Sequence, residues 1–334
     1  MEIKKIVHII DNQYIKDNST YSKDTEMHDL KTIYNKVEST LKSQAKEYFG
    51  KHGNVQEYPN PPKLSDLQIV SLAITSECLQ IDSENLLWSK LKKDYPKLFI
   101  QLPHRTTYNR RRRRLSELIS NCNNTISDYL YAEQPDNTLI IDSMPIPICK
   151  IVREKSSTVC RNPERDDVVA RKGKNLVMNG WYIGYKLHLI TTSTGIYRDM
   201  MITGANVHDN YFLKIITSED HHLRNHEILG DRGYLGKATQ LRLFEEVEIT
   251  LSVPYRRNQK DFRKYDEGKK IKRKQIEVIF SQLCDEFMIR RNYAKTFDGL
   301  YARLTSKLAA KTFKQFWNLK NSRPLNQTKH SLAA

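Results

Sequence analysis

The stretch Thr138-Leu139-Ile140-Ile141-Asp142-Ser143 decides the fold prediction, because an apolar run ends there in a carboxylate. A second run, Glu227-Ile228-Leu229-Gly230, ends in Asp231. Short apolar runs of this kind are typical of buried strands. Ligand-binding groups of an open α/β sheet gather outside the carboxyl ends of its strands. We therefore predict that Asp142 and Asp231 lie together at the ends of neighbouring strands, although either acid taken alone could simply begin a turn.

A third acid, Glu277, lies in a segment with helical spacing. Its neighbours Ile276 and residues 278–280 are apolar, so Glu277 lies on or beside a buried face, where an unpaired charge is costly. Taken alone, it could equally be a surface glutamate. Together the three acids predict a site for two Mg²⁺ or Mn²⁺ ions, because hard cations take oxygen ligands and a metal pair suits phosphoryl transfer. We expect Asp142 to bridge both ions, with Asp231 and Glu277 each binding one.

The order of the predicted elements indicates an α/β (α+β) fold. Strands are predicted at 138–148, 181–192, 196–203, 227–230 and 247–253, and helices at 209–217, 237–246, around 277 and at 301–317. Three strands in a meander, then alternating helices and strands, predict an RNase H-like mixed sheet flanked by helices. Pro145 and Pro147 suggest that the first strand is an edge strand or stops pairing early. Residues 150–180 are polar and are predicted to form a long loop.

The first part of the chain is predicted to be all-α. Residues 1–60 are polar, with one amphipathic helix at 31–49, and the proline-rich stretch 58–62 is a stiff break. Three helices follow, starting near residues 65, 82 and 106, the third running toward Tyr131. They suggest a helix-turn-helix-like DNA-binding domain. We therefore divide the chain into segments 1–60, 61–134, 135–320 and a tail, 321–334.

The third helix contains five consecutive arginines, Arg110, Arg111, Arg112, Arg113 and Arg114. Five residues in a row cover every face of a helix, so some of them must point away from the core. Arginine matches phosphate geometry and supplies affinity that does not depend on nucleic-acid sequence. We predict phosphate contacts from this run, the alternative being a solvated charged face.

Composition points to a polyanionic partner. The 334 residues include 55 Lys and Arg against 39 Asp and Glu, a net charge of +16. No apolar run approaches the roughly 20 residues of a membrane-spanning helix, and the N-terminus lacks the apolar region of a secretory signal. We expect a cytoplasmic, nucleoid-associated protein with no membrane partner. Its five cysteines contain no Cys-x-x-Cys pair and are predicted to be reduced structural thiols.

Several further residues allow more than one role. Lys186 and His188 share one face of a predicted strand and could approach DNA or face solvent. Asp209 could join His208 in binding metal or cap a helix. Arg273, one helical turn before Glu277, could contact phosphate or form an ion pair. Trp181 is predicted to be part of the core.

The loop from 255 to 274 is strongly basic, with ten Lys or Arg residues against three acids. It immediately precedes Glu277, so we expect it to border the site and contact phosphates rather than remain a solvated loop.

The joint motifs resemble a known family. Their sequences are Tyr182-Ile183-Gly184-Tyr185-Lys186-Leu187-His188, Ala205-Asn206-Val207-His208-Asp209, Gly230-Asp231-Arg232-Gly233-Tyr234 and Arg273-x-x-x-Glu277. They look like the DDE-domain transposases of bacterial insertion sequences. The upstream motifs, Tyr95-Pro96-x-Leu98-Phe99 and Leu102-Pro103-x-Arg105-Thr106, resemble the insertion-sequence 982 family, and the likeness covers roughly residues 60–320. Related families often have tyrosine and lysine where this chain has Lys270 and Cys284.

The resemblance implies a DNA-cutting and DNA-joining enzyme. Such an enzyme binds the terminal inverted repeats of its element, cuts at the ends and joins the 3′-hydroxyl to target DNA, as a homodimer. Besides the arginine run, DNA contacts are then expected from Lys186, Arg232, Arg256, Arg257 and Arg273. A nuclease that only hydrolyses is a rival reading that shares the same metal site. A non-catalytic DNA-binding derivative is another, but all three acids are present.

Overall fold

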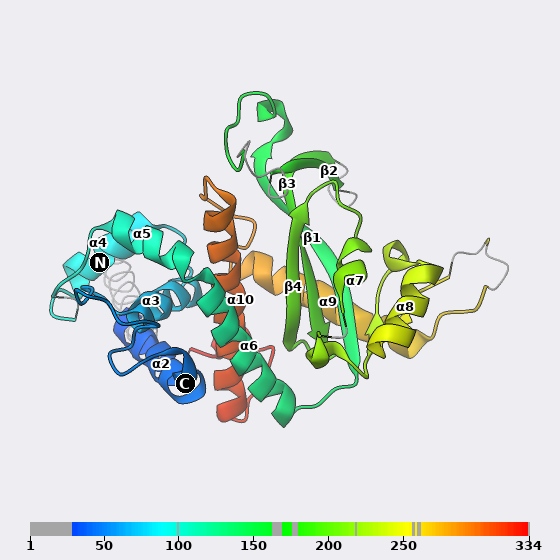
Figure 1. Ribbon diagram of the computed structural model, residues 1–334, viewed down its shortest axis with the longest axis horizontal. Coiled ribbons are helices and arrows are strands. Elements are labelled where there is room, and N and C mark those ends of the chain that lie inside the picture. Colours follow the sequence, from blue (N-terminus) through cyan, green and yellow to red (C-terminus); the bar gives the residue numbers. More distant parts are fainter. Residues whose placement is uncertain are drawn as a thin grey trace, which may run out of the picture.

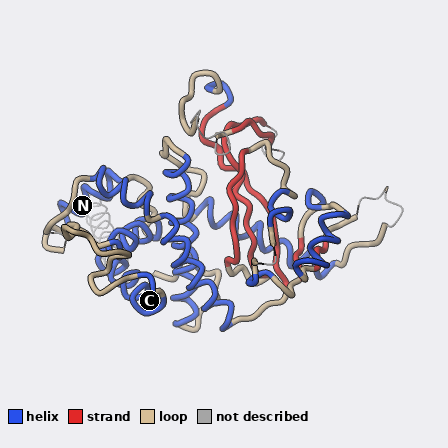
Figure 2. Tube along the Cα trace, in the orientation of Figure 1, coloured by secondary structure: helices blue, strands red, loops and turns tan. Residues whose placement is uncertain are grey.

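The computed structural model describes residues 29–332, apart from 99, 162–168, 176–179, 218, 256–257 and 259–261. Within these residues an all-α region precedes a mixed sheet flanked by helices (Figure 1). The strands lie together at the centre of the molecule, with helices on either side (Figure 2). The predicted fold class is therefore confirmed.

The sheet has RNase H-like topology. Its strands are β1 (Thr138–Lys150), β2 (Arg171–Asn175), β3 (Gly180–Thr192), β4 (Tyr197–Gly204), β5 (Glu227–Leu229) and β6 (Thr250–Ser252). β1, β3 and β4 form an antiparallel meander, and β5 and β6 extend the sheet in parallel on the other side of β1.

β2 lies inside the stretch that was predicted to be a loop, so that prediction was wrong in part. It pairs with residues 180–184 of β3, and β4 pairs with residues 185–191 of the same strand, so β2 continues the edge where β4 ends. Its sequence, Arg-Lys-Gly-Lys-Asn, has no apolar alternation, so the strand leaves no hydrophobic signal.

The two prolines of β1 do not mark an edge strand, because β1 is the central strand and pairs with β3 as far as Lys150, but the prediction that pairing stops early is correct on the β5 side. Glu227 N donates to Asn137 O, so odd-numbered residues of β1 direct their backbone groups toward β5. β5 pairs only as far as Ile140. Pro145 and Pro147 therefore point to the side that β5 has already left, and their missing N–H groups interrupt no ladder.

The helical region contains one helix more than predicted after residue 60. Its helices are α2 (Leu30–Gln44), α3 (Asp66–Cys78), α4 (Glu84–Asp94), α5 (Arg105–Arg114) and α6 (Ser116–Glu133). Ser65 and Gln68 form a capping box on α3. The predicted third helix is split at Leu115, where ψ is 12° and α5 ends. Ser116 Oγ then donates to Arg113 O at 2.9 Å, and the chain turns into α6, which packs along α10.

The helices that follow the first strands are α7 (Tyr211–Ile215), α8 (Lys237–Val247), α9 (Glu267–Asp285) and α10 (Phe297–Lys320). α10 stands between the helical region and the sheet (Figure 1), and almost all of its residues from 299 to 318 are buried. A single hydrophobic cluster includes side chains from α2, α3, α6, α9, α10 and the sheet. The helical region and the sheet are therefore joined by a shared core.

The cysteines are free, as predicted. In the described part of the chain, no helix has the length and apolarity that crossing a bilayer requires.

Two lysines of α10 inside this shared core are paired with buried glutamates. Lys307 Nζ lies 2.5 Å from Glu77 Oε2, with both side chains at most 2% exposed, and it also donates to Phe287 O. Lys314 pairs with Glu286, whose other oxygen accepts from Thr328. Burying such charges is tolerable only with these partners.

Glu77→Ala is therefore expected to lower the free energy of unfolding by about 3–5 kcal/mol, because it leaves the Lys307 ammonium buried and unpaired. Glu246→Ala is the matched control, since it removes an exposed carboxylate paired with Arg242 at 3.7 Å and should cost less than about 1 kcal/mol. Urea unfolding followed by circular dichroism measures both. Equal losses in the two variants would contradict the assigned importance of the buried pair.

Candidate active site

Asp142 and Asp231 occupy equivalent positions on neighbouring strands. β1 and β5 pair in parallel, with Ile140 opposite Leu229. Asp142 lies two residues after Ile140, and Asp231 lies two residues after Leu229. Residues two apart on a strand share a face. The predicted neighbourhood of the two acids is thus present, and Asp231 acts electrostatically on Asp142.

The Asp142 carboxyl is partly buried among like charges. Its pKa is raised to about 7, chiefly by burial and in part by Asp231 and Asp209, whereas the Ser143 backbone N–H and the Arg273 guanidinium oppose the rise. Without a cation, the ionised form of Asp142 is therefore disfavoured. An environment of this kind attracts positive charge.

Asp231 is fixed by the turn that follows it. Its Oδ1 accepts a hydrogen bond of 2.7 Å from Gly233 N and so caps the short 3₁₀ helix Arg232–Tyr234. A Cβ atom on Gly233 would lie 2.9 Å from Asp231 Oδ1 and 3.7 Å from Asp209 Oδ2. Only glycine fits there without displacing a carboxylate, and two carboxylates lie close to this one point.

Asp209 is the third acid of this group, and the prediction that it caps a helix was wrong. α7 begins at Tyr211, and its N-cap residue is Asn210. The Asp209 carboxylate instead accepts from Ser143 Oγ at 2.7 Å and from Lys186 Nζ at 2.9 Å. Burial alone would raise its pKa, but these hydrogen bonds outweigh burial and lower it. The signal available in the sequence was its place in the Ala205–Asp209 motif.

The face of β3 that holds Lys186 and His188 is not solvated. Lys186 Nζ also donates to Val207 O at 2.8 Å, so its ammonium is held beside Asp209. His188 is fully buried next to Thr203 Oγ1, and burial lowers its pKa to about 4. A DNA contact by Lys186 stays a prediction.

Trp181 is 55% exposed rather than part of the core. It lies near the start of β3, opposite Lys174 of the edge strand β2, and the Lys172 ammonium lies 5.1 Å from its ring centre.

Glu277 lies apart from the aspartates in this structure. Its side chain is 61% exposed and pairs with Arg273 at 3.8 Å, and Arg273 also lowers the pKa of Asp142. Among the described residues, no three His, Cys, Asp or Glu side chains are placed closely enough to hold a metal ion. The structure therefore brings two of the three predicted acids together, links Glu277 to them through Arg273, and leaves the three-acid metal site a prediction.

A cationic cleft of about 540 Å³ opens beside Asp231. Its lining includes Arg232, Arg273 and part of the predicted basic loop, from Phe262 to Tyr265. As expected, this segment borders the site, but the prediction that it is a loop as far as residue 274 was wrong, because α9 already begins at Glu267. Arg256 and Arg257, which were predicted to contact DNA, lie outside the described residues.

The arginine run of α5 is divided between two roles. Arg111 pairs with the buried Asp66 at 2.5 Å, and Arg112, only 2% exposed, pairs with Glu84 at 3.2 Å. These two arginines hold α5 against α3 and α4, so the predicted set of phosphate contacts narrows to Arg110, Arg113 and Arg114. Arg110 and Arg114 are exposed.

Comparison with known proteins agrees with this geometry. Residues 132–294 match the family model described as "Transposase DDE domain", and all three predicted acids lie within the match. No curated protein matches the chain.

Two solved structures are similar to this one at low identity. The piggyBac transposase synaptic complex with hairpin DNA has a TM-score of 0.44 and 10% identity, over 90% of this chain and 76% of that chain. The pre-cleavage Mos1 transpososome has a TM-score of 0.20 and 12% identity, over 82% of this chain and 84% of that chain.

Asp142→Asn is expected to stabilise the metal-free protein at about pH 8. Between the unfolded pKa of 3.8 and the folded pKa of about 7, the folded state holds one proton more, so the wild type loses stability as the pH rises through this window. Asparagine avoids that loss. We expect a gain on the order of 1–3 kcal/mol at about pH 8, because one pKa unit is worth about 1.4 kcal/mol, and almost none at about pH 4.

Urea unfolding at the two pH values measures the gain. Glu245→Gln, which neutralises an exposed carboxylate on α8, is the control and should change stability little at either pH. A gain for Asp142→Asn that did not depend on pH would show that the site holds no excess of negative charge.

Proposed function

We propose that this protein is the DDE transposase of a bacterial insertion sequence, of the insertion-sequence 982 family. One observation carries the proposal: the segment that matches the transposase DDE domain contains Asp142 on β1 and Asp231 two residues after the end of β5, at equivalent positions along this parallel pair. The cationic cleft beside Asp231 has the charge that a DNA backbone requires.

The carboxylates fit divalent metal ions. Asp142 and Asp231 supply hard oxygen donors. The pKa of Asp142 is raised chiefly by burial and in part by Asp231 and Asp209, and a bound cation would favour its ionised form. Two Mg²⁺ or Mn²⁺ ions are proposed, and Asp142, Asp231 and Glu277 would hold them. When bound, such ions lower the pKa of an attacking hydroxyl and stabilise the leaving oxygen. Glu277 would have to leave its pair with Arg273 to take part.

The residues of the chain position DNA for two successive displacements. In the first, water attacks a phosphodiester at the element end, a new P–O bond forms, and the departing oxygen becomes a free 3′-hydroxyl. In the second, that 3′-hydroxyl attacks a target phosphodiester, and the target strand leaves through its own 3′-oxygen. Arg232 and Arg273 line the cleft, and we propose that they contact the phosphates flanking the bond that breaks.

The proposed partners are the terminal inverted repeats of the element and target DNA. Two ends must be joined in concert, so a homodimer on DNA is proposed, acting in the cytoplasm at the nucleoid. The alternatives are an RNase H-like nuclease that only hydrolyses and a non-catalytic DNA-binding derivative. The nuclease would use the same carboxylates, so joining activity is what separates it from the transposase.

The purified protein with Mg²⁺ or Mn²⁺ is expected to join a pre-cut element end, carrying a free 3′-hydroxyl, to target DNA. Joined strands are resolved on denaturing gels, and an end with a dideoxy 3′-terminus is the control that cannot react. Ca²⁺ should support assembly with little chemistry. Robust cleavage without any joined product would favour the nuclease.

Asp142→Asn, Asp231→Asn and Glu277→Gln are each expected to abolish cleavage and joining while leaving DNA affinity within about twofold, because binding rests on cations elsewhere. Asparagine at 231 preserves an acceptor for Gly233 N, so the turn is retained. Glu245→Gln should remain active. Fluorescence anisotropy and gel assays measure the two properties, and retained cleavage in Asp142→Asn or Asp231→Asn would sink the two-metal assignment.

A further inference from the structure

A second cationic cavity lies away from the aspartates, between the helical region and α10. It has a volume of about 480 Å³. Its walls come from the start of α4, from α5, and from the segment that leads into α10 and its first turns. Five cations line it, with one carboxylate: the cations are Arg105, Arg112, Arg113, Lys295 and Arg303, and the carboxylate is Glu84.

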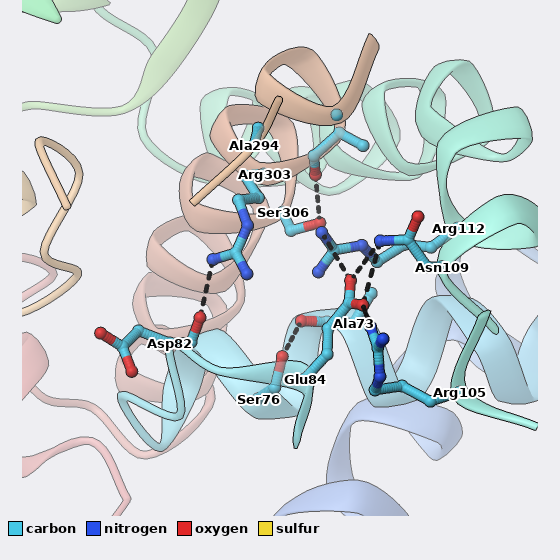
Figure 3. A network of polar contacts seen from close by, with 12 residues as sticks. Ala73, Ser76, Asp82, Glu84, Arg105, Asn109, Arg112, Ala294, Arg303 and Ser306 are labelled. Carbon is cyan, nitrogen blue, oxygen red and sulfur yellow. Dashed lines mark hydrogen bonds and ion pairs between the residues drawn. The ribbon is translucent and has the colours of Figure 1, made fainter. Parts of the chain in front are cut away.

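The charges of this cavity are poorly balanced. Figure 3 shows the Glu84 carboxylate meeting Arg105, Asn109 and Arg112 together. A single negative charge is thus shared by two guanidinium groups. Arg112 Nε is buried and has no hydrogen-bond partner among the described residues. Each such donor is costly to leave unsatisfied.

Arg303 adds another buried cation. It is 6% exposed, and its Nη1 donates at 2.8 Å to the carbonyl oxygen of Asp82, which is uncharged. Burial and the nearby Arg112 lower the pKa of Arg303, whereas the carboxylates of Glu77 and Glu84 oppose this shift in part. Two guanidinium groups of the same charge therefore lie at one cavity, and an anion bound there would relieve their repulsion.

Two further cavities continue this one on either side. Arg113 is shared with a cavity of about 650 Å³ that also contains Arg110 and Arg114, together with the acids Glu117 and Asp298. Lys295 is shared with a cavity of about 920 Å³ that also contains Lys150 and Arg153 and no acidic residue among those that line it. The three cavities thus form one basic track from α5 to the end of β1. A track of three cavities fits an extended polyanion better than a free nucleotide, because a single nucleotide would occupy only the central cavity.

We infer that the backbone of a DNA strand follows this track, with one phosphate in the central cavity near Arg105 and Arg303 and flanking phosphates on Arg113 and Lys295. The exposed ring of Tyr293, at the cavity wall, offers a surface for a neighbouring base or sugar. This inference rests on the proposed function, because DNA is the polyanion. It adds a binding site distinct from the cleft beside Asp231.

The double variant Arg113→Gln/Lys295→Gln tests the track, because each residue borders two cavities. Anisotropy with a labelled oligonucleotide duplex carrying a single-stranded extension, in Ca²⁺, measures affinity against salt. Losing two phosphate contacts should lower the slope of log K against log salt by about 0.7–0.9 per residue replaced. Lys329→Gln, an exposed lysine of the C-terminal segment, is the matched control and should leave the slope unchanged.

A direct readout guards against a purely structural effect. In the wild type, the same DNA should protect Lys295 from acetylation, detected by mass spectrometry, while Lys329 remains reactive. An unchanged salt slope together with unprotected Lys295 would overturn the inference. So would dAMP binding to the central cavity in calorimetry with DNA affinity untouched by the double variant, since that would identify a free-nucleotide site. The binding assay involves no chemistry. If the double variant bound DNA more weakly but the wild type showed no joining activity, the track would be supported and only the proposed transposase activity would be contradicted.

Discussion

The parallel pairing of β1 with β5 is the constraint on which the candidate active site depends. It is short, running only from Thr138 opposite Glu227 to Ile140 opposite Leu229. Because both strands run in the same direction, the residues that follow them emerge at the same sheet edge. Asp142 and Asp231 are far apart in sequence, and this register alone places them at equivalent positions. A shift of one residue would turn one of the two carboxylates to the opposite face.

Like charges brought together in this way need compensation, and the chain supplies part of it. Lys186 and Ser143 hold Asp209, Gly233 N holds Asp231, and Arg273 lowers the pKa of Asp142 while pairing with Glu277. Arg273 therefore balances negative charge on both sides of the site. The same cation pairs with the Glu277 carboxylate along α9, and Glu277 lies apart from the aspartates. The metal-free arrangement is thus explained by electrostatics, and in the proposed enzyme divalent cations would replace this balance.

The sequence was sufficient for the features that arise from local patterns. Apolar runs ending in acids located β1 and β5, and capping residues such as Ser65 and Ser83 located the starts of α3 and α4. Features set by distant partners were not predictable. The roles of Arg111 and Arg112 depend on Asp66 and Glu84, which lie more than 25 residues away, and the role of Asp209 depends on Ser143 and Lys186. β2 lacks an apolar pattern because it only completes an edge of β3.

The buried helix α10 connects the two functional surfaces of the molecule. Its first turns carry Gly299 and Arg303 of the basic track, and its later turns pack in the core that also contains side chains of the sheet. The pairs Lys307–Glu77 and Lys314–Glu286 fix this helix to α3 and to the end of α9. Close-packed interiors transmit displacement rather than absorb it. A DNA strand held on the track would therefore be held at a fixed position relative to Asp142 and Asp231, and positioning of this kind is what in-line displacement requires. In the proposed transposase, the helical region thus contributes to catalysis by fixing where the strand enters the site.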